Sequence, residues 1–392
     1  MGDYLKAFEK HSEYETYSSG DMLKPNVSYC EDNNEVHYNP WTWADTYLTT
    51  VAREDGTISF NILSSMGTEY ITSISYSKNN GETWTTTTNK DNKEANLVIT
   101  VNVNTGDTIL WKGTATQTGY YDDDDGDYYC SSFSSTANFD VQGNVMSLLY
   151  GDNFKGKVNL TGKNYVFCML FNENTKVVSA EKLSLPATTL ASGCYYRMFY
   201  GCTSLTTAPV LPATTLASGC YMDMFYGCTS LTTAPVLPVT TLAESCYDSM
   251  FRGCTSLTTA PVLPATTLAS NCYQHMFKDC TSLTTAPSIL PAATLVDECY
   301  NNMFSGCTLL ATAPELPATV LANDCYGEMF SDCTKLNYIK AMFTTTPSPT
   351  YTSYWVSGVA TTGTFVKNSA ATWNVTGTNG IPTGWTVETA SA

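Results

Sequence analysis

An internal repeat of about 26 residues, which fills much of the second half of the chain, limits the fold more than any other feature of this sequence. The block LPATTLASGCYYRMFYGCTSLTTAPV recurs with small changes, and in each copy a second cysteine follows the first at a constant offset of eight. A unit of this size cannot bury its apolar side chains alone, so successive copies must stack on one another. The sequence therefore predicts a solenoid. The first cysteines of its units are Cys194, Cys220, Cys246, Cys272, Cys299 and Cys325.

Each unit offers one segment with strand character and one with turn character. Leu205, Leu211 and Phe225 belong to the apolar positions that stay fixed from copy to copy, which places them in the interior. The Thr-rich residues 203–208 favour a β-strand, whereas residues 217–225 supply only a short helical or 3₁₀ turn. One strand per unit predicts a parallel stack that grows by about 4.8 Å per coil.

This pattern resembles the BspA-type leucine-rich repeat, whose signature FxGCTSLxxxxLP is matched by residues 199–205 and by five later copies. The resemblance covers residues 165–342 and implies an α/β leucine-rich-repeat solenoid. It also implies that the cysteine of GCTSL stands where other leucine-rich repeats carry Asn, whose side chain satisfies backbone groups of the turn. A partial unit at residues 170–177 places Asn174 at that position. We interpret this unit as the N-terminal cap of the stack.

Cysteine usage raises the question of disulfides and metal. Twelve of the 15 cysteines lie in the two repeat series, and only Cys30, Cys130 and Cys168 lie outside them. So many cysteines could indicate a disulfide framework, but the repeated slot is small and apolar, and a thiol there acts as a compact hydrophobic group. Mostly free thiols are expected. Zinc is disfavoured because the eight-residue spacing fits no common zinc pattern and the chain has only three histidines. We predict no metal site and no cofactor.

The regions beside the repeat predict two further structural units. Residues 55–152 alternate short apolar and polar segments with turn signals, a pattern typical of an all-β sandwich. Residues 343–392 are rich in aromatic side chains, which are suited to cover the end of a solenoid. The expected fold is therefore multidomain, with an N-terminal all-β sandwich, an α/β leucine-rich-repeat solenoid and a C-terminal cap. The aromatic residues expected to cover the last coil are Tyr354, Trp355, Phe365, Trp373 and Trp385.

An acidic run at residues 122–127 has two interpretations. Tyr121 and Ser132 stand where an EF-hand-type loop would carry its first and last ligands, which excludes that loop type. Looser calcium coordination by the carboxylates and a solvated loop tip are both left open.

Residues 1–54 are too few to hold a core of their own, and we interpret them as a docking segment. The stretch PNVSYCEDNNEVHYNP resembles a leader of virion proteins from gut-bacterial, crAss-like phages. A leader shared by varied downstream modules implies attachment to a common particle, and the alternative is a strand that pads the sandwich. The candidate docking residues are Tyr4, Leu5, Phe8, Tyr29, His37 and Tyr38.

Charge and hydropathy narrow the classes of partner. The net charge of −17, without any cluster of Lys and Arg, disfavours nucleic acid. No apolar run approaches the roughly 18 residues of a membrane span. The first ten residues lack the apolar core of a secretory signal, which fits a particle assembled inside a host cell and released by lysis. A trimmed signal is the alternative.

Nothing in the sequence recommends catalysis. The three histidines are scattered, and neither a G-x-S-x-G motif nor a P-loop is present.

Comparison of the units finds varying positions directly after the fixed Cys-Tyr pair, and these positions would stack into an irregular outer face. Such a face could bind a partner, or it could vary because nothing constrains it. The candidate binding residues are Tyr196, Arg197, Met222, Asp223, Asp248, Gln274, His275, Asn301, Asn302 and Glu328. A further varying position holds Tyr200, Tyr226, Arg252, Lys278, Ser305 and Ser331.

A nearly invariant Thr pair marks the expected strand, for example Thr232 with Thr233. Because adjacent residues of a strand point to opposite faces, only one member of each pair is expected at the surface. This argues against an ice-binding array and leaves a hydroxyl-lined wall that could suit a glycan or a protein.

The resulting hypothesis is a non-enzymatic virion protein, either a fibre or a decoration of a capsid or tail, whose solenoid adheres to a host-cell glycan or protein. Other virion proteins would bind its docking segment, and a homo-oligomer is allowed. The alternative is a BspA-like adhesin of the bacterial cell surface.

Overall fold

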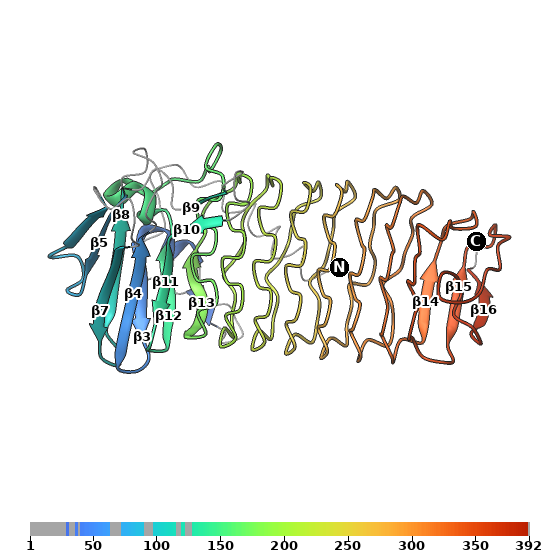
Figure 1. The fold of residues 1–392 in the computed structure, drawn as a ribbon. Coiled ribbons are helices and arrows are strands. Elements are labelled where there is room, and N and C mark those ends of the chain that lie inside the picture. The colour runs from blue at the N-terminus through green and yellow to red at the C-terminus, as the bar shows by residue number, and fades with distance from the viewer. Residues whose placement is uncertain are drawn as a thin grey trace.

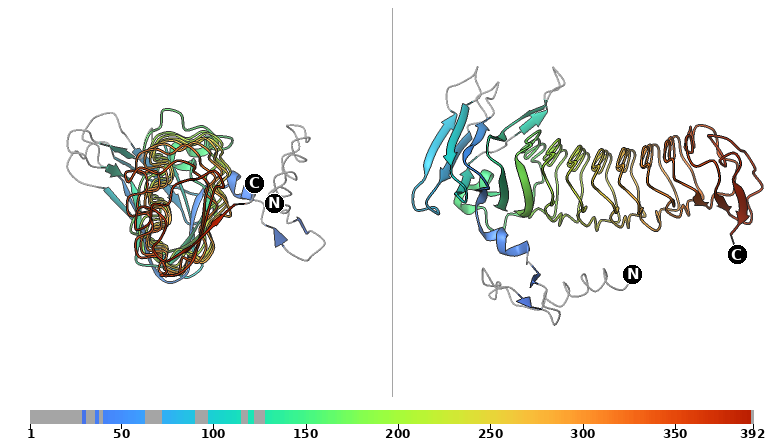
Figure 2. Two further views of the ribbon diagram at one scale, coloured as in Figure 1. Left: turned by 90° about the vertical axis from the view of Figure 1, so that its right-hand side faces the viewer. Right: turned by 90° about the horizontal axis from the view of Figure 1, so that it is seen from below.

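The computed structural model describes residues 29–30, 36–37, 40–62, 72–89, 97–114, 119–121 and 128–390. A body of β-sheets stands at one end, and a long stack of coils extends from it toward the C-terminus (Figure 1). Seen along the stack, the coils lie nearly on top of one another (Figure 2, left). The predicted solenoid is therefore present.

Most of the expected docking segment cannot be compared with the structure. The candidates Tyr4, Leu5, Phe8 and Tyr38 lie outside the described residues, as does the acidic run at 122–127. The other two candidates face each other in an antiparallel pair formed by β1 (Tyr29–Cys30) and β2 (Val36–His37).

The N-terminal body consists of two β-sheets that face each other. The order of the larger sheet is β13-β12-β3-β8-β5-β6, and that of the smaller is β11-β4-β7. Phe60, Trp111 and Phe133 meet between the sheets, with ring centroids 4.7 to 6.2 Å apart, so the expected all-β body is present. The strands are β3 (Leu48–Ala52), β4 (Gly56–Ile62), β5 (Thr72–Ser77), β6 (Thr85–Asn89), β7 (Leu97–Val103), β8 (Thr108–Gly113), β11 (Ser132–Ser135), β12 (Phe139–Asn144) and β13 (Val177–Ser184). Shorter elements are η2 (Pro40–Asp45), β9 (Gly119–Tyr121), β10 (Tyr128–Cys130), α2 (Ser147–Tyr150) and η3 (Gly151–Asn153).

The larger sheet crosses both boundaries that the sequence suggested for the body. It includes β3, which begins at Leu48 inside the expected docking segment 1–54. At the other end β13, which belongs to the first coil, pairs in parallel with β12. Strand pairing depends on partners far apart in the chain, whereas the boundaries at 54 and 152 came from local composition. The body and the solenoid therefore share one hydrogen-bonded sheet.

A disulfide links the same two parts. Cys130 of β10 is bonded to Cys168 in the first coil. Gly119 of the neighbouring strand packs directly against this bond, because a Cβ there would lie 2.5 Å from the Sγ of Cys168 and 2.8 Å from the Sγ of Cys130. Only glycine leaves room for the disulfide at this position.

Each coil contains a segment that we call the turn ladder, which is residues 191–202 and the equivalent segment of each later coil. Every fourth residue has a left-handed backbone, as at Gly193 and Arg197 (φ 57° and 52°). Successive backbone N–H groups donate alternately to a carbonyl of the same coil and to a carbonyl of the next coil. The N–H of Tyr196 donates to the Gly193 carbonyl of the same coil at 3.0 Å, and the N–H of Arg197 donates to the Met222 carbonyl of the next coil at 3.1 Å. These bonds satisfy the backbone without a helix. The helical part of the expected α/β solenoid is thus wrong for the described coils.

The rest of each coil forms what we call the wall. The expected strand is reduced there to a single bridged residue, as between Thr207 and Thr233, and Pro209 soon follows without an N–H to donate. A single bridged residue does not impose the alternation of a strand, and both Thr232 and Thr233 are exposed. The expectation that only one threonine of a pair reaches the surface was therefore wrong. The wall segments of the first four full units are residues 203–216, 229–242, 255–268 and 281–295.

Thiol hydrogen bonds connect each coil to the one before it. The cysteine of every GCTSL motif donates its Sγ–H to a phenylalanine carbonyl of the preceding coil; Cys228 donates to Phe199 at 3.0 Å. In the first unit Asn174 takes this place and donates through Nδ2 to the carbonyl of Phe133, also at 3.0 Å. Asn174 thus satisfies a backbone carbonyl, as the family resemblance implies, but the unit expected to cap the stack joins it to the body instead.

Two columns of stacked rings fill the interior. One runs from Phe171 to Phe330 and the other from Tyr195 to Tyr326, with neighbouring ring centroids 5.2 to 6.0 Å apart. Trp355 stands at the end of both columns.

The C-terminal segment continues the stack and closes it. Its sheet is formed by parallel strands β14 (Tyr338–Ala341), β15 (Thr364–Lys367) and β16 (Thr386–Thr389). Four of the five aromatic residues expected to cover the last coil are buried, but Tyr354 is 58% exposed and points into solvent.

The twelve repeat cysteines are free and buried, as expected. Burial raises the pKa of their thiols, to about 12 for Cys220, Cys272 and Cys280. Since the thiolate is the reactive form, these groups should be inert in the folded protein.

We predict that a Cys30→Ser variant reacts with a thiol reagent at pH 8 at least about a thousandfold more slowly when folded than in denaturant, because reaction requires unfolding. Denaturant alone should release twelve thiols, and denaturant with reductant fourteen. The measurement is a time course of thiol titration. Rapid labelling of the folded protein, or fourteen thiols without reductant, would contradict the structure.

Candidate functional site

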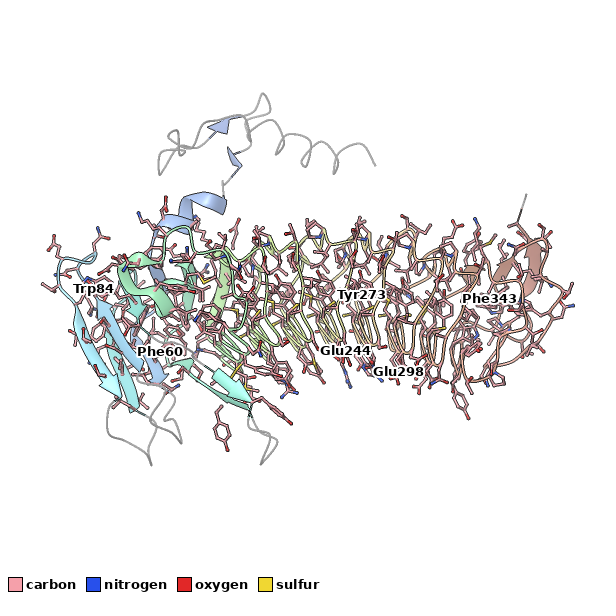
Figure 3. The ribbon with its side chains drawn as sticks, turned by 90° about the horizontal axis from the view of Figure 1, so that it is seen from above. Phe60, Trp84, Glu244, Tyr273, Glu298 and Phe343 are labelled. Atoms are coloured by element: carbon pink, nitrogen blue, oxygen red, sulfur yellow. A yellow bond between two sulfur atoms is a disulfide. The ribbon has the colours of Figure 1, made fainter. Side chains whose placement is uncertain are left out.

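The turn ladders form the candidate site, because they bring the varying residues of successive units to one side of the stack. Glu244 and Glu298 mark this edge in Figure 3. The alternating hydrogen bonds hold equivalent residues of neighbouring coils beside each other, so side chains from different units touch although about 26 residues separate them. The predicted irregular outer face is thus assembled as a column of contacting side chains.

Close stacking leaves the candidate residues less exposed than a free outer face would be. Glu328 alone among the ten is exposed. A side chain on one coil covers its equivalents on the coils above and below, because the coils are only about 5 Å apart. Half-buried candidates are Arg197, Met222, Gln274, His275 and Asn301, and buried ones are Tyr196, Asp223, Asp248 and Asn302.

A group of tyrosine and arginine side chains occupies the N-terminal part of the face; we call it the Tyr–Arg patch. Tyr200 and Tyr226 stack with ring centroids 4.7 Å apart. The guanidinium of Arg197 lies 4.9 Å from the ring centre of Tyr200, and that of Arg252 lies 5.3 Å from that of Tyr226. Each cation thus lies within the range of a cation–π contact. The ring faces of Tyr200 and Tyr226 are largely covered by each other and by the guanidinium groups. The edges and hydroxyls of these half-buried tyrosines are therefore the parts that a partner could contact.

An ion pair and a His–Asp contact connect units across the same face. Arg197 Nε lies 3.0 Å from Asp223 Oδ2, and His275 Nδ1 lies 3.6 Å from Asp248 Oδ1. Desolvation raises the pKa of the Asp223 carboxyl, and the hydrogen bond from Arg197 acts in the opposite direction. The sequence showed which positions vary between units. It did not show that the varying residues of neighbouring units pair with each other.

The C-terminal half of the face is a network of amides and carboxylates. Gln274 donates through Nε2 to Glu298 at 2.8 Å, and Lys278 donates through Nζ to Asn302 Oδ1 at 2.8 Å. Asn271 donates through Nδ2 to Gln274 at 2.9 Å. The face therefore changes from aromatic and cationic at one end to amide-rich and acidic at the other.

The side chains of this face are mainly guanidinium, amide, carboxylate and phenol groups. No set of three His, Cys, Asp or Glu side chains among the described residues could hold a metal ion. Nor does any described helix have the length and apolar character needed to cross a membrane. Planar cations, amides and tyrosine hydroxyls are suited to hydrogen bonding with a polar partner.

Comparison with known proteins adds a distant structural similarity. No protein-family model and no curated protein matches the chain. Among solved structures, it is similar to a leucine-rich repeat protein from Bacteroides ovatus ATCC 8483, with 14% sequence identity and a TM-score of 0.36. The match covers 69% of this chain and 65% of that chain. This chain thus spans somewhat less than two thirds of the protein that it matches, and the similarity carries no argument about function.

We predict that Arg197→Ala lowers the free energy of unfolding by about 1–2 kcal/mol at pH 7, because it leaves a buried carboxylate without its partner. The pKa of Asp223 is already raised by burial, and loss of Arg197 raises it further. A raised carboxyl pKa disfavours the folded state as pH rises, so the loss of stability should be smaller at pH 4 than at pH 7, because protonation of Asp223 on lowering the pH removes the buried charge. Urea unfolding at both pH values measures it.

Arg252→Ala is the matched control, because it also removes a guanidinium from a tyrosine ring. Its carboxylate neighbour Asp279 lies 4.0 Å away and has a side chain 55% exposed, so water solvates that carboxylate after the substitution. Arg252 lowers the pKa of Asp223 more weakly than Arg197 does, so the loss of stability should change much less between the two pH values. Equal behaviour of the two variants would contradict a special role for the Arg197–Asp223 pair.

Proposed function

We propose that this chain is a non-enzymatic adhesion protein whose turn ladders bind a glycan or protein on a host-cell surface. The observation that carries the proposal is the division of each coil into a fixed interior and a varying turn ladder. Stacked rings and thiol hydrogen bonds keep the coils in register. The backbone can thus accept different side chains on the turn ladder without a change of fold.

The disulfide supports a role outside the cytosol. Disulfides persist in oxidising compartments and are rare in the cytosol of mesophilic organisms. Cys130–Cys168 lies where the body meets the first coil, so an oxidising environment would stabilise the junction that carries the solenoid.

We further propose that the chain is a virion protein, a fibre or a decoration, that docks on its particle through the N-terminal segment. The support is the resemblance of the stretch PNVSYCEDNNEVHYNP to phage leaders. The competing proposal is a BspA-like adhesin of the bacterial surface, supported by the resemblance of the repeat. Both place the solenoid where it meets another surface.

Replacement of the Tyr–Arg patch tests the adhesion proposal. In the triple variant Tyr200→Ser, Tyr226→Ser, Arg252→Ser, the new residue is the one that later coils carry at this position, so the fold should tolerate it. We expect at least about a tenfold loss of binding to whole cells of gut-bacterial isolates that bind the fluorescently labelled wild-type protein. Cytometry across a protein concentration series measures it.

The control is a triple Thr→Ser variant of the wall at Thr206, Thr232 and Thr258, which changes the same number of residues on the other side of the coil. This variant should bind like wild type. Unchanged binding of the patch variant, or no binding of the wild-type protein to any isolate, would contradict adhesion through the turn ladders.

Mass spectrometry of purified phage particles from gut communities tests the location. We expect peptides of this chain to co-purify with capsid and tail proteins through a density gradient and at a constant ratio to them. Recovery in bacterial surface fractions instead of particles would sink the virion proposal and favour the bacterial adhesin.

A further inference from the structure

We propose that the wall is the contact surface of a homodimer, in which a second copy of this chain packs its wall against the first. The proposal goes beyond adhesion and does not depend on what the turn ladders bind. It concerns the side of the solenoid that the turn ladders leave free.

Electrostatics favours this side over the rest of the molecule. The four wall segments contain no Asp, Glu, Lys, Arg or His, although the chain carries a net charge of −17. The charged residues of the same coils lie in the turn ladders. Two copies would repel each other through most of their surfaces, and the wall is where contact costs least in electrostatic energy.

A column of exposed aliphatic side chains runs along the wall. Val210, Val236 and Val262 occupy the same position in successive coils and are 51%, 52% and 59% exposed, and Ile289 is 39% exposed in the next coil. Single exposed apolar residues are common, but a contiguous row of them marks an interaction surface. Burial of this row would remove apolar area from water in every coil.

The chemistry of the wall fits another wall better than a polar ligand. Its segments contain no aromatic, amide or charged side chain that could orient a sugar or a peptide. Some threonine hydroxyls already donate to backbone carbonyls, such as Thr206 to Val178 at 3.0 Å and Thr284 to Thr258 at 3.2 Å. What the wall then presents is methyl groups and neutral hydroxyls, which an identical surface can cover without leaving a charge unpaired.

The size of the wall is sufficient for such contact. Four coils at about 4.8 Å each, with about ten wall residues at about 3.3 Å each, give a face on the order of 600 Å². Two such faces would bury on the order of 1,200 Å² together, which is the lower end of the range for specific protein–protein interfaces. A two-fold axis would make the contact self-complementary and direct both sets of turn ladders outward. The dimer would then present two binding faces and gain avidity on a repetitive surface.

Sedimentation velocity of the full chain over about 1–100 µM tests the proposal. We expect a species of twice the 42.7 kDa chain mass. The variant Val210→Glu, Val236→Glu, Val262→Glu should raise the dissociation constant at least about a hundredfold, because it places like charges opposite each other in a desolvated contact. Circular dichroism establishes that each variant is folded.

The matched control places three glutamates away from the wall, in Val98→Glu, Tyr354→Glu and Val375→Glu, at positions that are 50%, 58% and 42% exposed. It adds the same charge and should remain dimeric. A monomeric wild type at the highest concentration, or equal association of wall and control variants, would overturn the proposal.

Cross-linking gives a second measurement that does not depend on added charge. In a Cys30→Ser background, Val236→Cys should yield a covalent dimer with a bifunctional maleimide, because two walls bring this position near its counterpart. Val375→Cys, with a similar exposure in the cap, should not. Equal cross-linking at the two positions would show that a dimer forms through some other surface.

Discussion

The rest of the structure depends on the backbone hydrogen bond that every second turn-ladder residue donates to the next coil. This bond fixes the spacing between coils, as in the 3.1 Å bond from Arg197 N to the Met222 carbonyl. At this spacing the Phe and Tyr rings stack at 5.2 to 6.0 Å, and a cysteine Sγ–H reaches the carbonyl of the preceding coil. Interior packing, in turn, keeps water away from these bonds and strengthens them.

The same spacing determines what a varying residue can do. A side chain on the turn ladder is held against the equivalent side chains of the neighbouring units. Its contacts are therefore with residues about 26 positions away and not with its neighbours in the chain. Arg197 therefore pairs with Asp223, and Tyr200 stacks on Tyr226. On the wall, equivalent residues of successive coils also lie beside each other, and they form a row of valines and a row of paired threonines. One backbone geometry thus gives the turn-ladder side a different set of side chains in each coil and gives the wall nearly the same side chains in each coil.

The sequence predicted the features that recur and missed those that depend on pairing or on backbone conformation. The solenoid and the free thiols followed from repeated residue types. The left-handed residues were concealed because Arg197, Ser249 and His275 occupy a conformation that glycine usually marks. The pairing of β12 with β13 could not be inferred, because the two strands belong to segments of different composition. Exposure of the candidate binding residues was overestimated because neighbouring units cover one another.

The junction between the body and the solenoid determines how the turn ladders are presented. Two independent connections hold it, the β12–β13 pairing and the Cys130–Cys168 disulfide, and Phe133 of the body stacks on Phe171 of the first coil at 5.1 Å. A hinge at this point would need all three to break, so the solenoid has one direction relative to the body. A body attached to a surface would therefore hold the turn ladders at a set angle and distance from it. Rigid presentation lowers the entropy lost when a second copy or a repeated ligand binds.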